Sequence, residues 1–423
     1  MCTETGRFSG NEHTSRRPAR MPALGGARDP RAGPPPMSQP GFFATVFRRS
    51  RDTAGPCRIG AQDRQQGGGP RRREGRRAGL TTDLSEGGEA MFSPRQTIRV
   101  GMIGCGGNAR GHMRRLLGID NVEIVAVSDV AEAAVQATRE LDPRLEDVPV
   151  FSDYARMLRE AELDAVEIST PHTLHFEQIM AALDAGLNVL CEKPMVCAIA
   201  DAKSVAARAE QSGLVVGVSY QRHTQAPYRY CREVIASGDV GECYFVTCWQ
   251  SQNWYRRQVG GSTWRSKQEW SGGGQLNDSG SHLVDIVLWM TGLRPREVFA
   301  YQENLEAEVD ILSAISVEFD SGALCNFSVV GHAVNFHEEI TLFCDECTLG
   351  IRGPEVWRWN DETKQVISGE ELGRSWDPDT NFIAALRGQE PVQATVADAV
   401  QVARLSEAVW ESAATGQPVR PAD

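Results

Sequence analysis

The chain has 423 residues and a formal net charge of −12, a length that exceeds what one hydrophobic core usually holds and that suffices for two domains. Residues 1–90 contain 16 Arg, no Lys and 9 acidic residues, a local charge of +7, so the remainder carries −12 − 7 = −19. An acidic folded part argues against nucleic-acid binding. No apolar run is long enough to predict a transmembrane helix.

Residues 1–94 are predicted to be a disordered extension, because a stretch this rich in Arg, Gly and Pro cannot bury enough apolar surface to offset its ordering entropy. Three interpretations compete. It could be a targeting peptide, since it is Arg-rich and poor in acids. It could be a nucleic-acid-binding arm centred on the basic run 71–77. It could also be a translated upstream stretch with Met91 as the natural start, which is favoured because the regular pattern begins only after Met91.

The cysteines indicate a reduced protein. There are 11, scattered along the chain, and an odd count does not suggest a disulfide framework. Cys105 lies in a glycine-rich turn, which fits a cytoplasmic location. Cys344 and Cys347 form a C-x-x-C with no second pair and no nearby His. Two half-buried thiols beside a strand turn are favoured there over zinc, so no metal site is expected.

A regular pattern starts at Thr97. Residues 98–103 form a short apolar strand, a glycine-rich turn follows, and a helix is expected through Leu117. A second strand, 122–127, ends at Ser128 and Asp129. The order strand, glycines, helix, strand, acid is the context that makes a glycine motif a specific dinucleotide signal. A turn of this kind that binds nothing is the alternative.

Each position of this turn has its own physical role. Gly104 allows the tight turn, Gly106 lets the backbone approach a pyrophosphate, and Ala109 is small enough for the helix to pack on the strand. The helix N-terminus offers free N–H groups to phosphates. The predicted cofactor loop therefore comprises Gly104, Cys105, Gly106, Gly107, Asn108 and Ala109.

Asp129 predicts which dinucleotide binds. It lies 25 residues after Gly104, where a carboxylate accepts hydrogen bonds from the adenosine-ribose hydroxyls and repels a 2′-phosphate. NAD is therefore expected in preference to NADP.

Strands and helices continue to alternate to residue 219. Helices are expected over 154–160, 176–185 and 200–211, and strands over 165–169, 188–191 and 215–218. This alternation predicts a doubly wound parallel sheet, whose ligands lie at the carboxyl ends of strands. The residues that follow those ends are expected to contact the cofactor: Thr170, Pro171, His175, Glu192 and Lys193. His175 could equally be a structural residue at a helix start.

The remaining residues predict a second domain, 220–423, after a first domain at 95–219. Strands are expected over 242–252, 297–304, 311–319, 323–329 and 339–344. The turn 320–322 indicates a hairpin. A last helix over 396–414 is expected to pack back on the first domain.

Several motifs occur together: G-C-G-G-N-A at 104–109, S-T-P-H-T-L-H at 169–175, A-L-D-A-G-L-N-V-L-C-E-K-P at 182–194 and G-G-G-Q-L-N-D-S-G-S-H-L-V-D at 272–285. On these motifs, residues 97–423 resemble the Gfo/Idh/MocA family, which includes glucose–fructose oxidoreductase and inositol dehydrogenase. The resemblance implies an N-terminal Rossmann domain and a C-terminal α/β domain with a large open, mostly antiparallel sheet. The flat face of that sheet often builds dimers or tetramers.

Lys193, Asp278 and His282 match the residues that the family uses for catalysis. Lys193 would hydrogen-bond the reacting oxygen, and His282, with an ordinary pKa of about 6.5, would be the general base. Asp278 shares a face with His282 if the helix begins at about Ser279. It would then orient the imidazole or bind a substrate hydroxyl. The alternatives are a helix N-cap for Asp278, a packed polar residue for His282 and a solvated surface residue for Lys193.

Substrate contacts are predicted at Arg222, Trp264, Arg265 and Asp285, although Asp285 could be a buried polar partner instead. The Lys193–Pro194 bond is expected to be cis, since such bonds persist in tight functional turns.

Together these features predict an NAD-dependent oxidoreductase that moves a hydride between a secondary alcohol of a sugar or polyol and the nicotinamide. One alternative is a redox-neutral, NAD-retaining glycosidase, epimerase or lyase of the same family. Another is a non-catalytic NAD-binding regulatory protein. A homodimer or homotetramer is expected.

Overall fold

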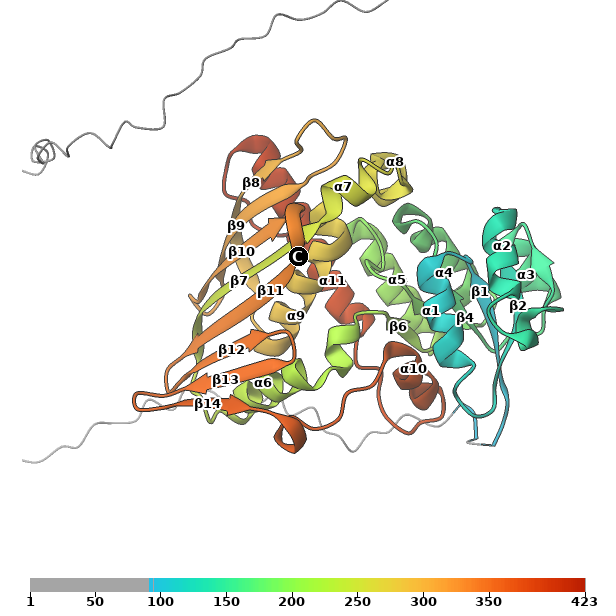
Figure 1. Cartoon of the computed structure of the whole chain (residues 1–423), viewed down its shortest axis with the longest axis horizontal. Coiled ribbons are helices and arrows are strands. Elements are labelled where there is room, and N and C mark those ends of the chain that lie inside the picture. The colour runs from blue at the N-terminus through green and yellow to red at the C-terminus, as the bar shows by residue number, and fades with distance from the viewer. Residues whose placement is uncertain (1–90, 94, 423) are drawn as a thin grey trace, which may run out of the picture. The chain divides into compact units, whose positions relative to one another are not determined.

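The computed structural model describes residues 91–93 and 95–422, so the predictions made for residues 1–90 lie outside the described residues. The first sheet has six parallel strands in the order β3-β2-β1-β4-β5-β6, which confirms the doubly wound architecture (Figure 1). Its strands are β1 (Ile98–Ile103), β2 (Val122–Ser128), β3 (Val150–Phe151), β4 (Ala165–Ile168), β5 (Asn188–Cys191) and β6 (Val216–Val218).

Helices connect these strands and cover the sheet. They are α1 (Gly107–Leu116), α2 (Glu132–Arg139), α3 (Tyr154–Glu160), α4 (His175–Asp184) and α5 (Ile199–Ser212). The strands β4 and β5 are buried at every residue, as expected for parallel strands with both faces covered. The sequence pattern did not predict α2, because only Val135 and Thr138 of that short helix are buried.

The second sheet has eight strands in the order β14-β13-β12-β11-β7-β10-β9-β8. Every neighbouring pair is antiparallel except β10 and β7, so the sheet is mixed and mostly antiparallel, as expected. The predicted hairpin joins β9 to β10 around Gly322, whose φ is +87°. The strands are β7 (Cys243–Asn253), β8 (Pro295–Glu303), β9 (Leu312–Phe319), β10 (Leu324–Val330), β11 (His332–Cys344), β12 (Thr348–Arg352), β13 (Glu355–Trp359) and β14 (Lys364–Ile367).

Three long helices, α6 (Ala226–Ser237), α9 (Ser281–Thr291) and α11 (Val396–Thr415), lie against one face of this sheet (Figure 1). Two short helices, α7 (Trp254–Gln258) and α8 (Gln268–Ser271), follow β7. Nearly every residue of α9 is buried, so α9 forms the centre of the core between the sheet and the first domain.

Two late helices pack on the first domain. As expected, α11 lies along α5. The sequence did not indicate that α10 (Pro378–Leu386) also returns, to pack against α1 and β6. Phe382, Ile383 and Leu386 of α10 join the hydrophobic cluster of β1 and α1, so residues far along the chain complete the core of the first domain.

The nine cysteines within the described residues are all free thiols. Cys344 and Cys347 are buried, more deeply than the half-buried position that we expected. No group of His, Cys, Asp and Glu in residues 91–93 and 95–422 is arranged to hold a metal ion. Within the same described ranges, no helix has the length and apolar character to cross a membrane.

Candidate active site

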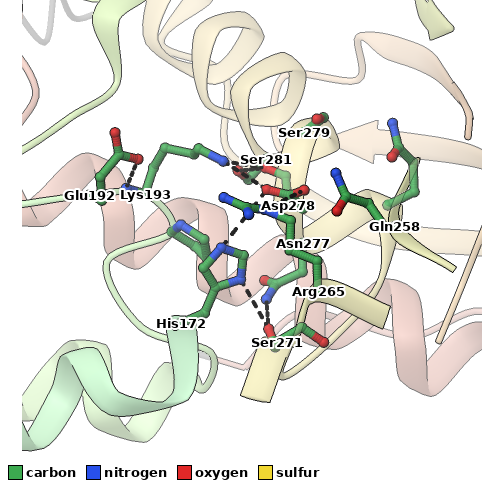
Figure 2. A network of polar contacts seen from close by, with 12 residues as sticks. His172, Glu192, Lys193, Gln258, Arg265, Ser271, Asn277, Asp278, Ser279 and Ser281 are labelled. Carbon is green, nitrogen blue, oxygen red and sulfur yellow. Dashed lines mark hydrogen bonds and ion pairs between the residues drawn. The ribbon is translucent and has the colours of Figure 1, made fainter. Parts of the chain in front are cut away.

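Two loops that are 85 residues apart in sequence meet at Lys193. The strand β5 delivers Glu192 and Lys193 to the edge of the first sheet, and the Lys193–Pro194 bond is cis, as predicted. Lys193 Nζ donates to the backbone oxygen of Asp278 at 3.1 Å and to its Oδ1 at 3.0 Å (Figure 2). The side chain is buried, so its ammonium is held in one place by a carboxylate from the second domain.

Asp278 is the centre of a cationic cluster. Its Oδ2 accepts from Trp254 Nε1 at 2.7 Å and lies 3.2 Å from Arg265 Nε. Burial opposes ionisation, but Lys193 and Arg265 outweigh it and hold the pKa of this carboxyl well below its usual range. Asp278 is therefore a carboxylate whose acceptor sites are already directed at donors.

The start of α9 differs from the expectation. A π-helical turn, Leu276–Gly280, contains Asp278, and the α-helix begins only at Ser281. Within the described residues, Asp278 makes no side-chain cap and no hydrogen bond to His282 Nδ1. Its side chain binds Lys193 because the π turn directs it toward the first domain. Its predicted role in binding a substrate hydroxyl stays a prediction.

Glycine is required just before that turn. A Cβ on Gly274 would lie 1.9 Å from the backbone oxygen of Asp310. The Asp310 carboxylate accepts the N–H of Gly274 at 2.9 Å and that of Leu276 at 2.8 Å. These contacts pin the backbone that presents Asp278.

His282 lies one turn along α9 from Asp278 and lines a cavity of about 550 Å³ together with Lys193. Its ring packs edge-on against Tyr220, with 5.8 Å between centroids. Burial, aided by the charges of Arg222 and Lys193, lowers the pKa of His282 well below its ordinary value. Within the described part of the chain, its Nδ1 has no hydrogen-bond partner. The lowered pKa favours the neutral imidazole, which is the form that a general base must have.

The glycine-rich turn has the shape that a dinucleotide needs. Gly104 has φ +101°, and a Cβ there would lie 2.6 Å from Ser169 O. A Cβ on Gly106 or Gly107 would meet nothing within 4 Å, so the backbone borders open space. The N-terminus of α1 has no side-chain cap, which leaves its N–H groups available for phosphates. The residues present therefore fit a bound dinucleotide.

The other predicted loop residues support this backbone. Ala109 is fully buried, as expected for close packing of the helix on the strand. Asn108 lines the cavity that contains Lys193 and His282. Cys105 contributes its backbone N–H, which donates to Asp129 Oδ2 at 2.7 Å. Its thiol is buried, and burial raises its pKa to about 11.

Asp129 stands at the end of β2 beside this loop. Its Oδ1 accepts the N–H of Ala131 at 2.7 Å. With Cys105 bound to the other oxygen, the carboxylate is fixed at the edge of the predicted cofactor site.

A smaller cavity of about 140 Å³ joins the glycine loop to Lys193. Thr170 and Glu192 line it, and so do two of the predicted substrate residues, Trp264 and Arg265. The guanidinium of Arg265 lies 4.3 Å from the Trp264 ring centroid. The structure therefore brings these four residues together around the lysine.

His175 has a different position. It is fully buried, and its ring nitrogens lie 2.9 Å from Pro194 O and 3.0 Å from Thr170 O. Pro171 precedes the short turn that leads into α4, the helix that begins at His175. The geometry makes His175 a clamp between two loop backbones, which corresponds to the structural alternative.

Two other predicted substrate residues are engaged with protein groups. Asp285 is buried and lies 2.9 Å from His223 Nε2, which is the buried-partner alternative. Arg222 Nη2 lies 2.6 Å from Glu338 Oε2. Arg222 also lines a second cavity of about 700 Å³, which shares lining residues with the cavity that contains Lys193.

The sequence analysis missed a buried polar cluster behind Glu192. His112 Nδ1 lies 2.8 Å from Asp379 Oδ1, and its Nε2 lies 3.1 Å from Glu192 Oε1. Burial opposes the charge, but Glu167 and Asp379 raise the pKa of His112 well above its ordinary value. Burial raises the pKa of Glu167 to about 7. The signal in the sequence that could have indicated this cluster is Glu167, a carboxylate inside the otherwise apolar strand β4.

His172 was also missed, although it stands in a quoted motif. It lines the smaller cavity, packs edge-on against Trp264, and its Nδ1 lies 3.1 Å from Ser271 O (Figure 2). Burial lowers its pKa to about 3, so it is a neutral wall of the site.

Comparison with known proteins agrees with this architecture. Residues 98–220 match the oxidoreductase family with an NAD-binding Rossmann fold, and residues 228–350 match the GFO/IDH/MocA C-terminal domain. The chain belongs to the Gfo/Idh/MocA family. It is therefore an NAD(P)-dependent oxidoreductase, and the predicted family and fold class are both confirmed.

Gfo/Idh/MocA relatives include dehydrogenases at low identity. A 4-carboxy-2-hydroxymuconate-6-semialdehyde dehydrogenase of a Sphingobium species is 27% identical over 308 residues, which is 70% of this chain and 92% of the relative. Inositol 2-dehydrogenase 3 of Saccharopolyspora erythraea is 28% identical over 244 residues, 55% of this chain and 66% of the relative. The crystal structure of the WlbA dehydrogenase from Bordetella pertussis, in complex with NADH and UDP-GlcNAcA, is 25% identical with a TM-score of 0.68 and covers 78% of this chain and 100% of that one.

Proposed function

We propose that this family member is an NAD-dependent dehydrogenase that oxidises a secondary alcohol of a sugar or polyol. The observation that carries the proposal is the ammonium of Lys193, fixed 3.0 Å from Asp278 Oδ1, on the same cavity as the neutral imidazole of His282. Oxidation of an alcohol needs a cation near the oxygen and a base for its proton.

The mechanism follows from these groups. Gly104, Gly106 and the N-terminus of α1 would hold NAD along the glycine loop, where it would supply the acceptor for the hydride of the reacting carbon. Lys193 donates a hydrogen bond to the substrate oxygen and stabilises its developing negative charge. His282 takes the hydroxyl proton, so the alcohol becomes a carbonyl. Asp278 keeps the ammonium in position and balances its charge.

Asp129 supports NAD over NADP. Its carboxylate is fixed beside the glycine loop by two backbone N–H groups. A negative charge there repels a 2′-phosphate and accepts ribose hydroxyls.

The test is an absorbance assay at 340 nm of the purified full chain with a panel of sugars and polyols, each with NAD and with NADP. NADH formation is expected, and His282→Ala should lower kcat/KM at least about 100-fold. His332→Ala, on the exposed part of β11, is the matched control.

Three outcomes would contradict parts of the proposal. Product without accumulating NADH indicates the redox-neutral alternative. NADH binding without any product indicates a non-catalytic protein. A strong preference for NADP means that Asp129 does not have the role proposed for it.

We also propose a homodimer or homotetramer built on the uncovered face of the larger sheet. Tyr301 and Leu324 point out from that face and are 69% and 46% exposed. A hollow of about 390 Å³ on the same strands is lined by Phe245 and Phe299. A reducing, cytoplasmic location is proposed as well, and the free thiols in the described part of the chain support it.

A further inference from the structure

A second, larger cavity adjoins the one that contains Lys193 and His282. It has a volume of about 700 Å³ and shares three lining residues with the first cavity: Gln221, Gln225 and Trp376. Each cavity alone is within the range that holds a small-molecule ligand. Because the two cavities share walls, the second offers room for a further group of a ligand held in the first.

The second cavity begins close to the proposed base. Arg222 lines it and, after burial, is the main cause of the low pKa of His282. Arg222 directly follows Gln221, a residue that lines both cavities. A substrate bound with its reacting carbon near His282 can therefore extend past Arg222 into this cavity.

The charge on the cavity wall is unbalanced. Glu338 is the one carboxylate that lines the cavity, and three donors already occupy it: Arg222 at 2.6 Å, Gln250 at 2.7 Å and Tyr228 at 3.1 Å. Arg352 also lines the cavity and is exposed. In the described residues, no carboxylate pairs with Arg352. Glu355 is the cross-strand neighbour of Arg352 but does not line the cavity. The cavity wall therefore carries one guanidinium without an ion pair, although the chain after residue 90 carries −19.

The remaining walls are largely apolar and flat. Phe336 is 60% exposed, and Tyr228, Trp376, Pro227 and Pro354 also line the cavity. Aromatic faces of this kind suit the faces of sugar rings, because they cover C–H groups while ring hydroxyls stay in water.

We propose that the second cavity is a subsite for a second ring of an elongated glycoside that carries a carboxylate, with Arg352 as the residue that binds this group. One unpaired guanidinium matches a singly charged, planar carboxylate, which Arg binds in a bidentate manner. This inference deepens the proposed dehydrogenase function and rests on it for turnover of the ligand. Binding of the ligand at the subsite does not require that function.

The test compares matched ligands on the full chain saturated with NADH. The probes are gluco-, galacto- and manno-configured disaccharides, each as the neutral sugar and as its uronic acid, with the corresponding methyl glycosides. Calorimetry gives Kd, and the assay with NAD gives kcat/KM. The variant is Arg352→Gln, and the control is Arg139→Gln, an exposed position on α2 outside the cavity.

At least one acidic disaccharide is expected to bind ten-fold or more tightly than its neutral form, and more tightly than its methyl glycoside. The acid-to-neutral ratio should fall below three-fold in Arg352→Gln and stay unchanged in Arg139→Gln. No discrimination, or discrimination that survives Arg352→Gln, overturns the subsite. Binding as expected with no NADH from any probe leaves the subsite standing and refutes the dehydrogenase. Turnover of methyl glycosides without any advantage for the acidic disaccharides refutes the subsite and leaves the dehydrogenase standing.

Discussion

At the scale of single residues, the ion pair between Lys193 and Asp278 accounts for the burial of both side chains. A buried ammonium and a buried carboxylate each cost several kcal/mol to desolvate, and their pairing offsets much of that cost. The pair is asymmetric in surroundings, because Asp278 also faces Arg265 and the indole of Trp254. Lys193 and Arg265 thus place two cations beside the cavity, which suits an oxygen that becomes negative during the reaction.

Replacing Lys193 with Met should lower kcat/KM by about 10²–10³, the effect typical of removing one donor to a developing oxyanion. NADH binding, measured by fluorescence titration, should change less than a few-fold, since the glycine loop is untouched. Equal losses in NADH affinity and in turnover would mean that Lys193 only supports the fold. Lys193→Arg, which keeps the charge, should not restore the rate, because a guanidinium does not fit where Nζ meets Asp278.

The burial of Glu167 predicts that the free energy of unfolding depends on pH. Its pKa rises from 4.5 to about 7 because it is buried, so the folded state binds the proton more tightly than the unfolded state. This contribution is fully present below pH 4.5 and is lost as pH rises through 7, with a limit of about 3 kcal/mol. His112, Asp379 and Glu192 face the same group.

Glu167→Gln removes the titration and should therefore raise Tm relative to the wild type more at pH 8 than at pH 5. Thermal unfolding followed by circular dichroism measures this difference. Glu123→Gln, at an exposed position on strand β2 of the same sheet, is the control and should show no trend. A Glu167→Gln difference that is constant with pH would show that the group does not titrate in this range.

At the scale of elements, the π turn before α9 presents the Asp278 side chain to Lys193. It needs glycine at position 274, where the Asp310 backbone occupies the space of a Cβ. Gly274→Ala should lower the free energy of unfolding by about 3 kcal/mol. Urea denaturation is the measurement. Gly111→Ala, inside α1 with no contact closer than 3.4 Å to its Cβ, should leave stability unchanged or slightly higher.

The strands of the first domain were predictable and several other elements were not. Buried parallel strands such as β1 and β5 are short, continuous apolar runs, so β1 and β5 were expected with the bounds that the structure shows. The strands β12, β13 and β14 lie toward one edge of the larger sheet. Only Ile367 of β14 is buried, so its sequence carries little periodic signal.

At the scale of the whole molecule, the first domain is completed from the far end of the chain. The helix α10 contributes Asp379 to the cluster around His112 and Phe382 to the core beside β1. The boundary expected between residues 219 and 220 separates the strands of the two sheets. The packed core of the first domain also includes α10. Motifs identify segments, but the contact between α10 and α1 spans more than 260 residues and has no local signature.

The proposed assembly also belongs to this scale. Leu324→Glu places a charge in the hollow on the open sheet face and should convert the oligomer to a smaller species, because a buried unpaired carboxylate opposes association. Light scattering coupled to size exclusion measures the mass. Val130→Glu changes an equally apolar residue, 88% exposed on the first domain, and should leave the mass unchanged. A Leu324→Glu protein with the wild-type mass would exclude this face.

The sequence by itself indicated the family through the resemblance of its motifs. It indicated the α/β architecture and the residues at strand ends through local periodicity and through glycines that only one backbone geometry accepts. Only the tertiary structure decided that Asp278 binds Lys193 and that His175 and Asp285 have buried protein partners. It also decided that buried carboxylates raise the pKa of His112 and that a second cavity adjoins the first. These outcomes depend on distances between segments far apart in the chain, and burial and charge at such contacts are properties of the packed molecule.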